Sequence, residues 1–256
     1  MLNVFSFLTC AQLEQCRRVS QACRKQASGE VLWKEAIDNQ YIIGKKKFDR
    51  YLGTVDEEPS RPDDIYAFLK SPSHFWPKKS NAQTGLFLLI PPTVNKKPFT
   101  LNSLGELVKA PKKGNATCYR YISPSVVTAH GDTSEEKAHW IFLTKTVIDG
   151  TRNKSFAEQK AIVKKVSAES KVDYRVPKAL YVATAAFMNY VTSGEKKERL
   201  FNDDPWTFTR CPAQVNRLPV VVGGFASDGL SVRCDNFGDQ YHGVAAVLIK
   251  SDNSDE

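Results

Sequence analysis

The stretch "LFLLIPP", residues 86–92, decides the fold class of the larger part of the chain. Five consecutive apolar residues end at two prolines, and a short apolar run bounded by turn residues is typical of a buried strand. Similar strand patterns follow it at "TCYRYI" (117–122), "HWIFLTK" (139–145), "WTFTRC" (206–211), "PVVVGGF" (219–225), "LSVRC" (230–234) and "GVAAVLI" (243–249).

Helix signals lie between these strands. Two residue pairs have the spacing of a capping box: Ser103 with Glu106, and Ser155 with Glu158. In a capping box each side chain accepts a hydrogen bond from the backbone N–H of the other residue. Pro177 suits the first turn of a further helix, and "ALYVATAAF" (179–187) is apolar all round, as in a buried helix. We therefore predict an α+β fold with a mixed domain over residues 84–250 and a mostly antiparallel sheet.

Three further segments can be assigned from the residue types that they contain. "TVDEEPSRPDD" (54–64) has the prolines and acids of an exposed loop, so residues 41–83 are predicted to be a connecting region. Residues 251–256, "SDNSDE", are predicted to be an acidic tail. The glycines of "VVGGFASDG" follow neither the dinucleotide nor the P-loop pattern, and a hairpin turn accounts for them.

The first 40 residues show helical rather than strand periodicity. Thr9 and Gln12 have capping-box spacing, and the apolar residues after them recur at steps of three and four. Ser28 can cap a third helix. No Lys or Arg precedes Arg17, and Asn3 and Ser6 interrupt the apolar run of the first eight residues, so a secretory leader is disfavoured. The interrupted run also disfavours a lipid-anchoring box at Cys10. We predict a compact module of three short helices over residues 1–40.

The residues of this module resemble an F-box. "VFSFL" (4–8) is followed by "QLEQCRRVSQACRKQASGEVLWKEA" (12–36), in which Val-Ser, Ala-Ser and Leu-Trp pairs occur in the family's order and spacing. Two positions depart from the family pattern: the usual Leu-Pro start is absent, and Cys23 stands where a tryptophan often follows the Val-Ser pair. More faintly, residues 84–250 resemble uncharacterised domains that follow F-boxes in amoeba-associated intracellular bacteria.

The resemblance implies an adaptor that is not an enzyme. An F-box binds a Skp-type adaptor of a cullin-RING ubiquitin ligase, and the rest of the chain then presents a target protein. The implied location is the cytoplasm, or the host cytosol if a bacterium secretes the chain as an effector. The residues expected to bind the Skp-type adaptor are Val4, Phe5, Leu8, Leu13, Cys16, Val19, Leu32 and Trp33.

Composition narrows the partners further. The net charge is +8, but lysine pairs are scattered beside turn residues, so we expect no nucleic acid as a partner. No apolar run reaches about 18 residues, so we expect no membrane span. The six cysteines form no CxxC pair, which favours free thiols in a reducing compartment.

Residues that could carry chemistry are few in the larger domain. His130 and His139 lie too far apart in sequence for a strong metal signal, and nothing local pairs either with Cys118 or Cys211 as base and nucleophile. We therefore expect no catalytic residues, metal or cofactor. The alternative is an enzyme of unknown activity in the C-terminal domain, with the F-box used for targeting. Trp206 and Arg210 are expected to contact a target, because Trp and Arg anchor many interfaces; a tryptophan simply packed in the sheet is the competing interpretation.

Overall fold

The computed structural model describes residues 29–250, and the chain divides into two compact units, residues 1–42 and 43–256. In the first unit the structure describes helix α3 (Gly29–Tyr41), which covers the third helix predicted after Ser28. The first two predicted helices and the acidic tail lie outside the described residues.

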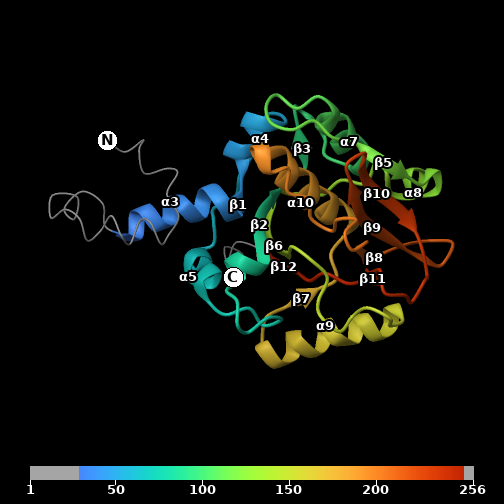
Figure 1. Ribbon diagram of the computed structural model, residues 1–256. Coiled ribbons are helices and arrows are strands. Elements are labelled where there is room, and N and C mark those ends of the chain that lie inside the picture. Colours follow the sequence, from blue (N-terminus) through green and yellow to red (C-terminus); the bar gives the residue numbers. More distant parts are fainter. Residues whose placement is uncertain (1–28, 251–256) are drawn as a thin grey trace. The chain divides into compact units, whose positions relative to one another are not determined.

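The second unit has an α+β fold, as predicted (Figure 1). Its helices are α4 (Lys45–Tyr51), α5 (Ile65–Lys70), α6 (Asn81–Thr84), α7 (Leu101–Lys109), α8 (Pro124–His130), α9 (Phe156–Ser170), α10 (Ala179–Thr192) and the 3-10 turn η2 (Gly194–Lys196). The strands are β1 (Ile42–Ile43), β2 (Gly85–Ile90), β3 (Thr93–Val94), β4 (Lys97–Pro98), β5 (Tyr119–Ile122), β6 (His139–Thr144), β7 (Tyr174–Arg175), β8 (Phe208–Val215), β9 (Leu218–Ala226), β10 (Gly229–Cys234), β11 (His242–Gly243) and β12 (Val247–Lys250).

Two five-stranded sheets organise these elements. The first has the order β1-β2-β6-β12-β7, and β6 pairs antiparallel with both β2 and β12. The second has the order β11-β8-β9-β10-β5, with antiparallel β8, β9 and β10 at its centre and parallel strands at both edges. Antiparallel pairing therefore dominates, as the sequence predicted.

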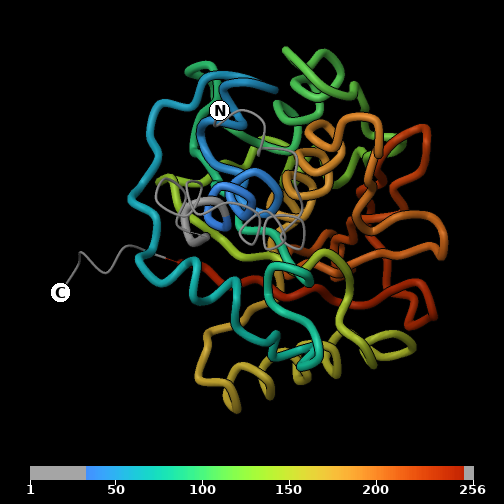
Figure 2. Tube along the Cα trace, turned by 60° about the vertical axis from the view of Figure 1, so that its left-hand side comes forward, coloured from blue at the N-terminus to red at the C-terminus, as the bar shows by residue number. Residues whose placement is uncertain are grey.

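Helix α10 holds the two sheets together. It contacts β2 and β6 of the first sheet and β9 and β10 of the second, and it runs beside the orange and red strands in Figures 1 and 2. Its residues are buried all round from Ala179 to Met188, because a helix between two sheets has no solvent face. Thr184 fits there because its hydroxyl donates to the Leu180 carbonyl. Within residues 29–250, no helix combines the length and apolar character needed to cross a bilayer.

The first sheet forms the other half of the core. Every residue of β2 is buried, as the apolar run predicted, and β6 is buried from Trp140 to Thr144. Phe87 and Trp140 stack with ring centroids 5.0 Å apart. The Trp140 Nε1–H donates to the Pro59 carbonyl, which ties the acidic loop of residues 54–64 to this sheet. Residues 43–83 thus form part of the second unit, and Phe48, Leu52, Val55, Ile65 and Leu69 are buried.

Two tight hairpins shape the second sheet. Asn216 and Arg217, both with positive φ, join β8 to β9, because a two-residue turn of this type matches the twist of the strands. Ser227 and Asp228 join β9 to β10. Gly224 lies inside β9 with φ +55°, at the edge of a register shift.

Several local predictions need correction. The capping box of α7 is formed by Thr100 and Ser103, not by Ser103 and Glu106. Gly223 and Gly224 lie within β9 rather than in a turn. Pro177 precedes the N-cap of α10, and "GVAAVLI" is divided between β11 and β12. The Ser155–Glu158 capping box of α9 is present as predicted.

Gly224 gives the first test. A Cβ there would lie 2.5 Å from Phe208 Cζ and 2.7 Å from Trp206 Cζ3, so Gly224→Ala adds a clash with two aromatic rings to the strain of a positive φ. Gly150→Ala is the matched control, because Gly150 has φ +75° and its Cβ would meet nothing within 4 Å.

We expect Gly150→Ala to cost about 1 kcal/mol and Gly224→Ala about 2–4 kcal/mol. In thermal unfolding followed by circular dichroism, these costs correspond to Tm decreases of about 2–4 °C and about 5–15 °C. Equal decreases for the two variants would contradict the close packing of both rings against β9.

Candidate functional site

The candidate site lies on the face of the second sheet that carries alternate residues of the segment entering β8. Trp206, Phe208 and Arg210 are two residues apart, and side chains at that spacing project from the same face of a strand. Their exposed fractions fall from 37% at Trp206 to 3% at Phe208 and 0% at Arg210. The face therefore runs from solvent into the core within five residues.

Stacked rings continue this face across the strands. Trp206 and Phe208 lie parallel with centroids 6.0 Å apart, and Phe208 stacks on His242 at 5.1 Å. The Arg120 guanidinium lies 5.3 Å from the Trp206 ring centroid, and that of Arg233 lies 4.5 Å from the Phe208 centroid. We call these five residues the aromatic ladder. Cation–π contacts of this kind stabilise both the ring and the cation.

The strand register explains why the ladder forms. His242 on β11 pairs with Phe208, Phe208 pairs with Gly223, and Ser231 pairs with both Gly223 and Tyr121. Directly paired residues present their side chains to the same face. Between Phe208 and Tyr121 there are thus only a glycine and a serine, which leave room for the long side chain of Arg233.

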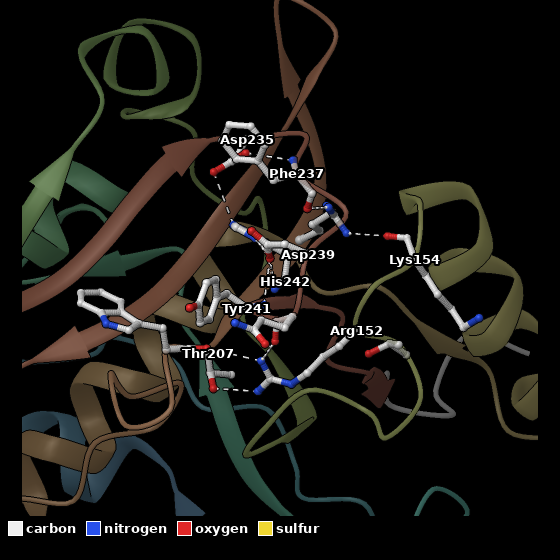
Figure 3. Close-up of polar contacts among 12 residues, drawn as sticks. Arg152, Lys154, Thr207, Asp235, Phe237, Asp239, Tyr241 and His242 are labelled. Atoms are coloured by element: carbon white, nitrogen blue, oxygen red, sulfur yellow. Dashed lines mark hydrogen bonds and ion pairs between the residues drawn. The ribbon is translucent and has the colours of Figure 1, made fainter.

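Two carboxylates bracket the buried end of the ladder (Figure 3). His242 is 1% exposed, its Nδ1 lies 2.7 Å from Asp239 Oδ1, and its Nε2 lies 3.4 Å from Asp235 Oδ2. Asp239 Oδ1 also accepts the backbone N–H groups of Tyr241 and His242. Burial acts to raise the pKa of Asp239, but these hydrogen bonds outweigh burial and hold the pKa below its ordinary value.

Arg210 anchors the loop that carries both carboxylates. Its Nη1 donates to the Lys154 carbonyl at 3.3 Å and its Nη2 donates to the Phe237 carbonyl (Figure 3). Nη1 also donates to Gln159 Oε1 at 2.6 Å. Burial lowers the pKa of this guanidinium, and the charges of Asp235 and Asp239 oppose the shift. One buried cation thus connects β8, α9 and residues 235–242, which we call the Asp-His loop.

Arg152 secures the other side of the Asp-His loop. Its Nη1 donates to the Gln240 carbonyl at 2.6 Å and to the Trp206 carbonyl at 3.3 Å, while its Nη2 donates to Thr207 Oγ1 at 2.8 Å. Burial lowers the pKa of Arg152, opposed by Asp239 and Asp149. Trp206 is therefore held through its own backbone by the same cation that holds the loop.

This arrangement fits a binding surface better than a reaction centre. His242 is buried between two carboxylates and lies under Phe208, so a substrate cannot reach its ring nitrogens. Exposed near it are the Trp206 ring and the guanidinium groups of Arg120 and Arg233, with Tyr121 in the same row of the sheet and Phe237 and Tyr241 on the Asp-His loop. Trp, Tyr and Arg are the residue types that most often dominate binding energy at interfaces.

The two residues predicted to contact a target behave differently. Trp206 is partly exposed and belongs to the surface. Arg210 is fully buried and hydrogen-bonded within the unit, so the prediction that it contacts a target needs correction. Its alternation with Trp206 and Phe208 placed it on the right face, but the chain covers that part of the face with α9 and the Asp-His loop.

The histidines and cysteines considered earlier do not form one site. His130 contacts the Gln214 carbonyl on β8, whereas His139 contacts the Tyr181 hydroxyl at the start of α10. Cys118 donates to the Asp228 carbonyl, and burial raises the pKa of the Cys211 thiol. Within residues 29–250, no group of three or more His, Cys, Asp or Glu residues has an arrangement that could hold a metal ion, and Cys118, Cys211 and Cys234 are free thiols.

The residues expected to bind the Skp-type adaptor lie mostly outside the described part. Val4, Phe5, Leu8, Leu13, Cys16 and Val19 precede residue 29. Leu32 and Trp33 belong to α3, and Trp33 is half-buried.

Sequence reasoning missed the Asp-His loop and Arg152, and it assigned Arg210 to target contact rather than to this loop. The available signal was the segment "CDNFGDQYH", residues 234–242, where two aspartates precede a histidine beside turn residues. Arg152 and Gln159 lie far from it in sequence, and only the fold brings them to the loop.

Removing the buried cation should be costly. In Arg210→Ala, the Gln159, Lys154 and Phe237 oxygens lose their donor, and we expect a loss of about 3–5 kcal/mol, or a Tm decrease of about 10 °C. Arg175→Ala is the control, because Arg175 is exposed and pairs with Asp173 at the surface; its effect should stay below about 1 kcal/mol. Equal effects in thermal unfolding would contradict an anchoring role for Arg210.

Asp239 should make stability depend on acid. Because its pKa is lowered in the folded chain, its ionised form stabilises the fold fully above about pH 4, and this contribution disappears as pH falls through the lowered pKa. Asp239→Asn should therefore unfold at lower temperature than the wild type near pH 6, with the gap closing towards pH 2–3, a window of about the carboxylate range.

Thermal unfolding between these pH values checks the prediction. Asp173→Asn, which alters an exposed carboxylate, controls for the change in net charge. A gap between wild type and Asp239→Asn that stays constant with pH would contradict it.

Comparison with known proteins identifies no relative of the chain. No family model, no curated protein and no solved structure matches the chain.

Proposed function

We propose that the chain is an F-box-type adaptor. Its first 40 residues would bind a Skp-type adaptor of a cullin-RING ubiquitin ligase, and its second unit would present a target protein to that ligase. The observation that carries the proposal is the order and spacing of the F-box residue pairs between Val4 and Ala36. Single pieces of that pattern are common, whereas their co-occurrence over one short segment is specific.

The division of the chain suits such a role. The F-box-like residues fall in a unit that ends at Ile42, and the second unit has its own core around α10. A small helical module with an apolar stripe cannot bury that stripe by itself, and a helical partner would cover it. The residues predicted to form this stripe are Val4, Phe5, Leu8, Leu13, Cys16 and Val19.

The second unit supplies a surface for the target. The aromatic ladder and its neighbours combine exposed rings with guanidinium groups on a base fixed by Arg152 and Arg210. Pre-organised side chains lose less conformational entropy on binding than mobile ones do. The proposal implies action in the cytosol, where the ligase works, and in the host cytosol if a bacterium delivers the chain.

Binding to a purified Skp-type adaptor tests the proposal. The full chain should form a complex in size-exclusion chromatography and in biolayer interferometry. Leu13→Asp places a charge on the apolar stripe and should weaken binding at least about tenfold, a loss of about 1.4 kcal/mol or more. Gln15→Asp adds the same charge beside the stripe and should change binding less than about threefold.

The Tm of the second unit should be unchanged in both variants, which separates lost binding from lost folding. If the full chain forms no complex, or if both variants bind equally well, the F-box proposal is wrong.

A further inference from the structure

We propose that the second unit recognises a short acidic segment of its target, in which a carboxylate neighbours an apolar side chain. The segment would bind across the aromatic ladder, with Trp206 taking the apolar side chain and Arg120 and Arg233 the carboxylate. This inference rests on the proposed function, since it names the chemistry of the target that the adaptor presents.

Among the described residues, four of the five exposed large apolar side chains belong to the ladder, its row of the sheet or the Asp-His loop, and the fifth, Leu218, starts β9 at the turn from β8. Within residues 29–250, every large hydrophobic side chain that is exposed lies on the second sheet or on its loops. These are Tyr121 (50%), Trp206 (37%), Leu218 (38%), Phe237 (67%) and Tyr241 (39%). Scattered single residues need no explanation, whereas a concentration of rings on one sheet indicates a binding surface.

The size of the surface favours a linear segment. Phe208 and Tyr121 lie in one row across four strands, and strands about 4.8 Å apart place them about 14 Å from each other. An extended peptide rises about 3.3 Å per residue, so four or five residues would cross this row. Gly223 and Ser231, which lie between the two rings, are small and buried, so such a peptide would instead contact the Arg233 side chain, whose guanidinium lies near the Phe208 ring.

The two ladder arginines retain donors for a ligand carboxylate. Arg120 uses Nε with Asp228 Oδ2 at 3.3 Å, and Arg233 uses Nη2 with Asp235 Oδ2 at 3.2 Å. Each guanidinium has five N–H groups, so donors remain on both side chains beyond these ion pairs, whereas Nε of Arg233 is buried and out of reach of a ligand. Both side chains are about two-fifths exposed, at 41% and 40%.

Charge complementarity points to an acidic partner with few charges. The chain carries a net charge of +8, which would attract an acidic segment at long range. A nucleic acid fits less well, because its phosphates would also approach Asp228 and Asp203, the second of which forms a β-bridge with Trp206. A single carboxylate can instead replace Asp228 at Arg120 without a row of repulsions.

This exchange predicts a specific effect of Asp228 on binding. The Asp228 side chain is exposed and forms an ion pair with Arg120 in the free protein, so it competes with the ligand carboxylate for Arg120. Asp228→Asn should free the guanidinium and increase affinity, whereas loss of Arg120 should decrease it.

A selection from random 12-residue peptides displayed on phage, with the full chain immobilised, tests the inference. Enriched peptides should carry Asp or Glu next to Leu, Phe, Trp or Tyr. The best one, made as a fluorescein-labelled synthetic peptide, is then measured by fluorescence anisotropy against the variants. Trp206→Ala, Arg120→Glu and Arg233→Glu should each weaken it at least about tenfold, as expected for anchor residues.

Two further arms sharpen the test. Asp228→Asn should bind the peptide about two- to fivefold more tightly, and Arg175→Glu, the same change on an exposed arginine of β7, should alter binding less than about twofold. Replacing the peptide's carboxylate residue by Lys should weaken binding to the wild type and improve binding to Arg120→Glu. Trp206→Phe, with circular dichroism of every variant, separates loss of the ring from loss of the fold.

The outcomes decide between the possibilities. Enriched peptides without acidic residues, or binding that the ladder variants leave unchanged, would overturn the inference. So would a (dT)12 oligonucleotide that binds more tightly than the peptide and is lost in the same variants, because the surface would then serve nucleic acid.

Binding of the Skp-type adaptor to the ladder variants is measured in parallel and should be unchanged. Peptide binding without adaptor binding would refute the F-box proposal alone, and adaptor binding without peptide binding would refute the present inference alone.

Discussion

The burial of one arginine side chain imposes most of the local structure around the candidate site. A guanidinium removed from water needs acceptors for its N–H groups and nearby negative charge, or the fold loses several kilocalories per mole. Arg210 obtains the acceptors from Gln159, Lys154 and Phe237. Asp235 and Asp239 supply the negative charge. Helix α9 and the Asp-His loop therefore close over β8 together, and the same two carboxylates lie on either side of the buried His242 ring.

This constraint separates support from recognition. The buried half of the sheet face consists mainly of charged groups that contact one another, and of these Arg210, His242 and Asp235 are shielded from solvent. The exposed half consists of rings and two arginines whose bonding capacity is only partly used. Trp206 joins the halves, because its carbonyl accepts from Arg152 while its ring lies at the surface beneath Arg120. A ring fixed through its own backbone can contact a partner without first being ordered.

The sequence predicted the regular parts of the fold because regular parts depend on local patterns. The continuous apolar runs of β2 and α10 and the Ser155–Glu158 cap need no knowledge of the rest of the chain. The α7 cap was misplaced because three hydroxyl or carboxyl residues at suitable spacing compete there, and packing selects Thr100. The site was less predictable. Trp206 is exposed and Arg210 is buried, although both belong to one alternating strand pattern. The difference arises because α9 and residues 235–242, which are distant in sequence, pack against Arg210.

The position of β12 has a consequence for how the chain reaches this structure. β12 comes from the end of the described sequence, yet it lies inside the first sheet, where Val247 pairs with Leu143 on one side and Arg175 on the other. During synthesis β6 and β7 emerge first and lack the strand that belongs between them. Closing such long loops costs chain entropy before any contact is gained, so folding dominated by distant pairings is slow. Until β12 arrives, the open edge of β6 can pair with another chain, and the nascent protein passes through a period in which a chaperone or early partner would protect it.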